Sequence, residues 1–204
     1  MAQQYSIDRA KFMDRNERAK LLKTCKERAE LDEVKGRTTW PARYMLVDLA
    51  LFSGLRVAEI AALKIDDLFL RAENPYLIVK KGKGGRKRIV YLDSALVKHL
   101  KHYIKHHLIN PDAQGPLFPG RNNQHCQPIT LMKSFKRAIK EAGLPNHFSI
   151  HCARHTYATY LLNDTKNLRY VQKQLGHAQV TMTALYADVL PEENGKLANM
   201  ITRD

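Results

Sequence analysis

The fold is decided by residues 76–92, which read YLIVKKGKGGRKRIVYL. Two short β-type runs, at 76–79 and 88–92, flank a basic segment that contains three glycines. Glycine permits the positive φ angles that the tip of a hairpin requires, so this stretch predicts an antiparallel hairpin with a basic tip. A third β-type run at 66–70 extends the hairpin to a small three-stranded antiparallel sheet.

The rest of the chain is patterned for helices. Apolar residues recur at helical spacing, and Gly54 and Gly143 mark helix ends. The 204 residues, 44% of them hydrophobic, suit one domain with a sizeable core. We therefore expect a mainly α fold with one small antiparallel sheet, an α+β class. The expected helices span 14–33, 41–52, 57–63, 94–109, 130 to about 142, 151–163, 167–175 and 180–187, with a last one from about 191.

The chain is strongly basic. It has 34 Lys and Arg residues against 20 Asp and Glu residues, a formal net charge of +14. Between positions 80 and 140 there are fourteen basic residues and two acidic ones, a local excess of +12. Such concentrated charge is typical of a surface that binds nucleic-acid phosphates, because neutralising phosphates releases counterions. Within this segment we expect DNA contacts from Lys81, Arg86, Lys87, Lys133, Lys136, Arg137 and Lys140.

The sequence argues against a membrane or secreted protein. Its most apolar stretch, 44–52, is far shorter than the roughly 20 residues that a span needs. The N-terminus lacks the basic flank and apolar run of a signal peptide. The three cysteines, at 25, 126 and 152, include no close pair, which excludes a disulfide framework and a cysteine-based zinc finger. We expect a soluble protein of the cytoplasm.

Two polar pairs interrupt apolar helical patterns. Arg56 and Glu59 are three residues apart, a spacing typical of a local ion pair on a helix. His151 and Arg154 have the same spacing and share a helix face. An arginine beside a histidine is suited to hold a phosphate and to transfer a proton. The alternative is structural, with a hydrogen-bonded core histidine and an arginine that reaches the surface.

Residues 168–188 allow a second interpretation of the whole chain. An apolar helix ends at Gly176 and another begins at Thr181, which is a helix-turn-helix pattern with residues 182–188 as the reading helix. That interpretation predicts a sequence-specific DNA-binding regulator without catalytic activity. Nothing in it requires a tyrosine at position 186.

Three histidines, at 99, 102 and 106, also share one stripe of the helix expected at 94–109. Such a stripe could bind a metal in principle. Lysines flank it at 98, 101 and 105, however, and no carboxylate or thiolate joins it in the sequence. We therefore expect a solvated basic face and no metal.

Taken in chain order, these segments resemble the catalytic domain of the tyrosine recombinases, the phage-integrase and Xer-type family. The resemblance covers about residues 10 to 195. Each motif is weak alone, but their shared order and spacing are very specific. The motifs are Gly-Leu-Arg-Val-Ala-Glu with Arg56, Gly-Lys-Gly with Lys83, His-x-x-Arg-His-Thr with His151 and Arg154, Leu-Gly-His with His177, and Tyr186 nine residues after that histidine.

The resemblance implies a site-specific recombinase that breaks and rejoins double-stranded DNA through a 3′-phosphotyrosyl intermediate. It implies no metal and no nucleotide cofactor, and a tetrameric assembly of copies on DNA. In the implied roles Tyr186 is the nucleophile, His151 its base and Lys83 the acid for the leaving 5′-oxygen. The phosphate oxygens are then bound by Arg56, Arg154 and His177.

The resemblance also implies a domain organisation. Residues 1–204 are expected to form a single catalytic domain, with a core of about 10–190. Residues 191–204 are expected to dock on a neighbouring subunit. The N-terminal DNA-clamping domain that is usual in the family is not expected in this sequence.

Overall fold

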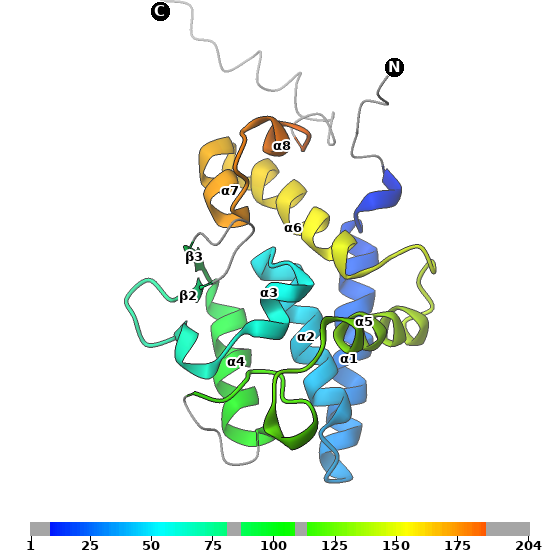
Figure 1. The fold of residues 1–204 in the computed structure, drawn as a ribbon. Helices are drawn as coiled ribbons and strands as arrows, with labels where there is room; N and C mark the ends of the chain where they lie inside the picture. Colours follow the sequence, from blue (N-terminus) through cyan, green and yellow to red (C-terminus); the bar gives the residue numbers. More distant parts are fainter. Residues whose placement is uncertain (1–8, 81–86, 109–113, 187–204) are drawn as a thin grey trace, which may run out of the picture.

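The computed structural model describes residues 9–80, 87–108 and 114–186 (Figure 1). Helices dominate it and one small sheet lies at its side, so the expected mainly α fold with a three-stranded antiparallel sheet is confirmed. The longer helices are α1 (Arg15–Val34), α2 (Thr39–Ser53), α4 (Ser94–His107), α5 (Pro128–Glu141) and α6 (Ile150–Thr165). The shorter ones are α3 (Val57–Ala62), α7 (Leu168–Leu175) and α8 (Thr181–Ala184). The strands are β1 (Leu68–Phe69), β2 (Tyr76–Val79) and β3 (Arg88–Tyr91), and short 3-10 helices cover Arg9–Lys11, Ile65–Asp67 and Arg121–Asn123.

The sheet has the order β1-β2-β3 and is antiparallel throughout. Leu77 pairs with Val90, and both are buried against the helices. The expected hairpin strands are therefore present, while its glycine-rich tip at 81–86 lies outside the described residues. The first strand is shorter than predicted, because the Asp67 carboxylate accepts a hydrogen bond from the Lys64 backbone N–H at 3.0 Å and closes a 3-10 turn there.

Capping residues set several helix ends. Asp14 accepts from the Glu17 backbone while Glu17 accepts from the Asp14 backbone, which forms a capping box at the start of α1. Asp93 accepts from two backbone N–H groups at the start of α4. Pro128 begins α5 two residues earlier than predicted, because proline fits the first turn of a helix. At the other end of the chain α8 is a single turn, shorter than the predicted 180–187.

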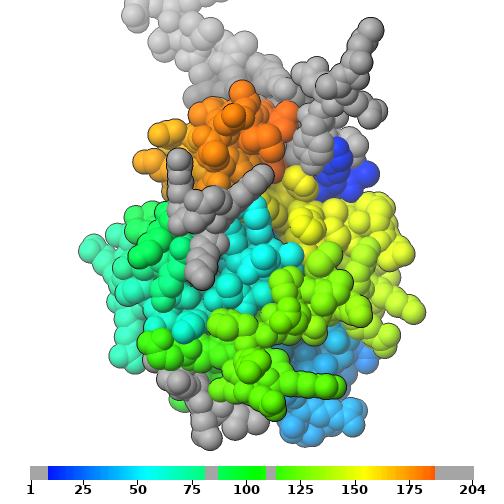
Figure 2. Space-filling model, viewed as in Figure 1, coloured from blue at the N-terminus to red at the C-terminus, as the bar shows by residue number. Residues whose placement is uncertain are grey.

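The core forms around α2, which packs against α1, α4, α5 and α6. A second, smaller apolar cluster joins α6 to α7 and the residues after α8. In Figure 2 the orange α7–α8 segment covers one end of the molecule beside the yellow α6. The second cluster consists of Phe12, Ala158, Leu162, Val171, Leu175 and Tyr186.

None of the described helices is long and apolar enough to cross a membrane.

Candidate active site

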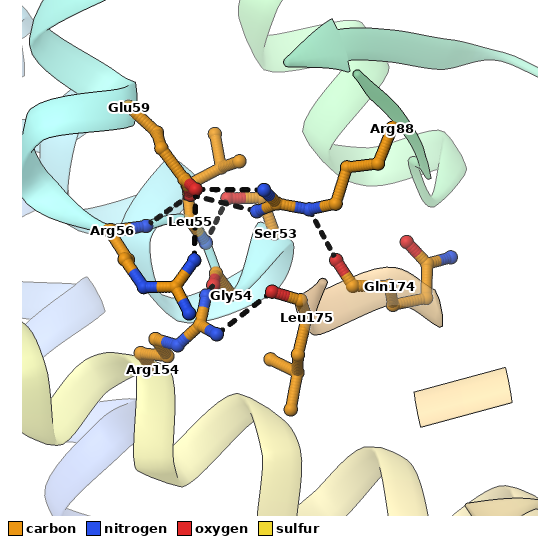
Figure 3. A network of polar contacts seen from close by, with 9 residues as sticks. All are labelled: Ser53, Gly54, Leu55, Arg56, Glu59, Arg88, Arg154, Gln174 and Leu175. Carbon is orange, nitrogen blue, oxygen red and sulfur yellow. Dashed lines mark hydrogen bonds and ion pairs between the residues drawn. The ribbon is translucent and has the colours of Figure 1, made fainter. Parts of the chain in front are cut away.

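Arg154 lies buried between three elements. It belongs to α6 and is only 7% exposed. Its guanidinium donates through Nη1 to the Gly54 carbonyl at the end of α2 and through Nη2 to the Leu175 carbonyl at 2.9 Å (Figure 3). Burial and the nearby charge of Arg56 lower the pKa of Arg154 to about 10. The side chain is therefore still a cation at neutral pH, and the ends of α2 and α7 hold it in place.

Arg56 stands at the N-cap of α3, and the local ion pair that its spacing suggested is present. Its Nη1 donates to Glu59 Oε1 at 3.0 Å, and its backbone N–H donates to Glu59 Oε2 at 2.8 Å. The side chain remains about one-third exposed. Figure 3 shows its guanidinium group next to that of Arg154, and its charge helps to lower the pKa of Arg154.

Arg88 is part of this site, although in the sequence it stood out only as one basic residue among many. Its two Nη atoms donate to the two carboxylate oxygens of Glu59 at 2.7 Å, and its Nε donates to the Gln174 carbonyl at 3.1 Å (Figure 3). Burial would raise the pKa of Glu59, but the hydrogen bonds and charges of Arg88 and Arg56 outweigh it and lower that pKa. A sequence signal was present: Arg88 lies two residues before Val90, and alternate strand residues share a face.

Tyr186 is 5% exposed, and its hydroxyl lies 3.0 Å from His155 Nδ1. The His177 ring is nearly parallel to the tyrosine ring, with centroids 6.4 Å apart, and its Nδ1 lies 3.0 Å from Thr183 Oγ1. Burial and the charge of Arg154 lower the pKa of His155 to about 4 and that of His177 to about 4. Both rings are therefore neutral at pH 7, when an imidazole can accept one hydrogen bond and donate another.

His151 is placed differently from His155. It lies in the first turn of α6, one turn before Arg154, and is exposed. It stands one helical turn before His155 and is among the groups that lower the pKa of His155. The sequence alone did not single out His155, although this histidine stands inside the motif at 151–156.

A sequence model of the phage integrase family matches residues 11–193. The chain belongs to the phage integrase family. Among curated relatives, this integrase-family chain is 31% identical to a tyrosine recombinase of Pseudothermotoga lettingae over 161 residues, which cover 79% of the chain and 54% of the relative. It is 31% identical to the tyrosine recombinase XerD of Shewanella oneidensis over 71% of the chain and 48% of that protein. The chain thus spans about half the length of the curated relatives it matches.

The fold of this integrase-family chain is also that of solved recombinases. The crystal structure of XerA recombinase superposes with a TM-score of 0.72 at 25% identity, covering 95% of this chain and 66% of that one. A XerH site-specific recombinase, crystallised in a pre-cleavage complex with its difH substrate, gives a TM-score of 0.75 at 24% identity over 95% of this chain and 55% of that one. The expected catalytic-domain fold is confirmed.

The structure brings together four of the six predicted catalytic residues of this integrase-family chain, namely Arg56, Arg154, His177 and Tyr186. His151 lies one turn away on α6, and Lys83 lies outside the described residues. The prediction of a reading helix at 182–188 is wrong over the part that the structure describes. There α8 spans only Thr181–Ala184, and Thr183 on it is buried. A one-turn helix is too short to read a major groove, which disfavours the regulator interpretation.

The predicted DNA contacts of the integrase-family chain fall into three groups. Lys81 and Arg86 lie outside the described residues, and Lys87 is exposed just before β3. On α5 three of the predicted residues are exposed, but Lys136 is half-buried and donates to the Asn146 carbonyl. The exposed α5 residues are Lys133, Arg137 and Lys140.

An open groove of about 1040 Å³ lies between β3 and α7. Arg88 and His177 line it, so the groove reaches the site. Lys87, Arg169 and Lys173 line it as well. Its basic lining suits a polyanion rather than a neutral ligand.

Proposed function

We propose that this chain is the catalytic part of a site-specific recombinase that cleaves and rejoins double-stranded DNA through a 3′-phosphotyrosyl intermediate. The observation that carries the proposal is the Tyr186 hydroxyl held by a neutral histidine beside two clustered arginines. The relatives named tyrosine recombinases and the DNA-bound XerH structure support the same class of substrate.

The phosphate would be bound by Arg56, Arg154 and His177. A phosphodiester under attack gains negative charge on its non-bridging oxygens, and planar guanidinium forks bind such oxygens two at a time. Arg154 donates to two backbone carbonyls in the free chain, and Arg56 is the more exposed of the pair. A neutral His177 can add one further donor.

In the covalent step Tyr186 is the nucleophile. The Tyr186 phenol oxygen attacks phosphorus, the bond from phosphorus to the 5′-oxygen breaks, and the DNA 3′ end becomes joined to the enzyme. The phenol proton goes to His151, while His155 orients the hydroxyl. The proton for the 5′-oxygen comes from Lys83 on the hairpin between β2 and β3. Attack by a 5′-hydroxyl on the phosphotyrosine reverses these steps without an energy source.

The proposal includes the assembly of several copies on DNA. Four copies would act on two DNA duplexes, with residues 191–204 docking on a neighbouring copy. Those residues lie outside the described ranges, so the assignment rests on the family resemblance. The strand chemistry proposed here uses no metal and no nucleotide cofactor.

The experiment is covalent trapping on a nicked suicide duplex that carries the chain's own recombination site. Wild-type protein should form an adduct that survives denaturation, and Tyr186→Phe should bind the duplex but form none. Tyr76→Phe, on β2 and outside the site, is the matched control and should form the adduct normally. No adduct with wild type would return the chain to the class of DNA-binding regulators. An adduct with Tyr186→Phe would mean that another residue is the nucleophile.

A further inference from the structure

Two histidines and a glutamate meet where the C-terminal ends of α1 and α4 come together, at the end of the molecule opposite α8 (Figure 1). Glu33 Oε1 lies 3.0 Å from His107 Nε2 and 3.7 Å from His102 Nε2. One ligand atom from each of these three residues lies within 4.8 Å of the other two. No step of the proposed DNA chemistry uses this cluster.

The cluster corrects the interpretation of the histidine stripe. His99 is not part of the cluster, because its Nδ1 lies 2.6 Å from Asp48 Oδ2 on α2. The carboxylate of the cluster belongs to Glu33 on α1, about seventy positions earlier in the chain, and the sequence did not indicate it. His107, which was outside the expected stripe, replaces His99 as a partner of His102.

We propose that Glu33, His102 and His107 form a binding site for one Zn²⁺ ion. Two imidazole nitrogens and one carboxylate oxygen are an established donor set for zinc, with the fourth position left to water. Tetrahedral bonds of about 2.0–2.1 Å place ligand atoms about 3.3 Å from one another. The separations of 3.0 and 3.7 Å lie on either side of that value, and the two histidines offer ligand atoms within 4.8 Å of each other, so side-chain rotations would close the site around an ion.

The surroundings of the site favour a fixed geometry with one open side. The His107 side chain is 9% exposed, and its ring packs against Tyr103 with centroids 5.9 Å apart. Glu33 and His102 are 38% and 52% exposed, which leaves access for a hydrated ion. Imidazole ligands favour zinc, copper and nickel over the oxygen-preferring magnesium and calcium.

Binding would join the ends of two helices that are far apart in the sequence. An ion that binds the folded chain and not the unfolded one raises stability by mass action. Because the C-terminal ends of α1 and α4 lie at the end of the molecule opposite α8, occupancy should stabilise the fold without entering the strand chemistry. The test therefore needs no recombination assay, and its outcome is independent of the proposed function.

The experiment titrates Zn²⁺ into chelator-stripped protein without an affinity tag, followed by calorimetry and by thermal unfolding. Wild-type protein should bind one equivalent and unfold at a higher temperature when loaded. His107→Gln and Glu33→Gln should each weaken binding at least tenfold and abolish the thermal shift. His147→Gln, which changes an exposed histidine outside the cluster, is the matched control and should behave like wild type.

A second measurement covers variants that fold poorly. Co²⁺ in place of Zn²⁺ should give the visible absorption of a tetrahedral site in wild type, and the exposed His102→Gln should abolish it while leaving circular dichroism unchanged. Absence of a saturable site in wild type, or equal binding by His102→Gln and His147→Gln, would overturn the proposal and leave a solvated ion pair.

Discussion

At the residue scale, the hydroxyl of Tyr186, the proposed nucleophile, lies 3.0 Å from a histidine to which the motifs alone gave no role. His155 lies next to Arg154 in the chain, yet on α6 the two side chains serve different neighbours. Arg154 reaches the ends of α2 and α7, while His155 reaches the Tyr186 hydroxyl. The two histidines therefore have different proposed roles. His155 positions the phenol, and His151 accepts its proton.

Conservative substitutions distinguish these two roles. His155→Ala should slow adduct formation about 10- to 100-fold, because it removes the hydrogen bond between residue 155 and the buried Tyr186 hydroxyl, at a cost of about 1–3 kcal/mol. His155→Asn should recover much of the rate, since its side-chain amide can donate a hydrogen bond to the phenol oxygen and leave the phenol proton for His151. His151→Ala should be slower by roughly 10²–10⁴-fold, and His151→Asn should not recover, because an amide cannot accept a proton at neutral pH.

The measurement is single-turnover adduct formation on the suicide duplex across a range of pH. Duplex binding by each variant serves as the control for folding. If His155→Asn is as slow as His155→Ala while His151→Ala is fast, then His155 is the proton acceptor and the two roles are exchanged.

At the element scale, β3 and α7 are joined by one set of polar contacts. Arg88 donates to the Gln174 carbonyl, and the Gln174 side chain accepts from the Tyr91 backbone at 3.1 Å. Gly176 ends α7 with a φ of +67°, and a Cβ there would lie 2.7 Å from Arg88 Cδ. The glycine therefore both ends the helix and leaves room for the arginine that holds Glu59.

Substitution of this glycine tests the arrangement. Gly176→Ala should destabilise the protein by about 1–3 kcal/mol through its left-handed backbone, and by a further amount because Arg88 must move. Gly36→Ala is the matched control, since Gly36 has a φ of +64° and nothing within 4 Å of the added atom. Urea unfolding measures both variants, and an equal decrease in stability would show that Arg88 does not pack against Gly176.

Local patterns and long-range contacts differ in how well the sequence predicts them. The hairpin strands and most helices were predictable, because alternation, helical spacing and capping residues are local signals. The length of β1 was not, because the Asp67 side chain accepts a hydrogen bond from the Lys64 backbone N–H and closes a 3-10 turn over the start of the predicted strand. The pairing of Glu59 with Arg88 and that of Glu33 with His107 could not be predicted, since each joins elements that only the fold brings together.

At the scale of the whole molecule, the excess charge lies on more than one element. The helix α5 packs on α3, whose N-cap is Arg56, and it carries the exposed residues Lys133, Arg137 and Lys140. The groove between β3 and α7 adds further basic residues beside Arg88. We expect duplex DNA to contact both regions while its phosphate reaches the site between them.

The salt dependence of binding tests the contribution of α5. Lys133→Ala combined with Lys140→Ala should weaken binding to every duplex alike and reduce the slope of log affinity against log salt by about 1.8, since each phosphate that a lysine neutralises contributes about 0.9 to that slope. The pair Lys23→Ala and Lys35→Ala, exposed residues of α1 and its C-cap, is the control and should leave the slope unchanged. Lys136 is a poorer choice, because its ammonium already donates to the Asn146 carbonyl. An unchanged slope in the α5 variant would mean that this face points away from DNA, and the groove between β3 and α7 would then carry the backbone contacts.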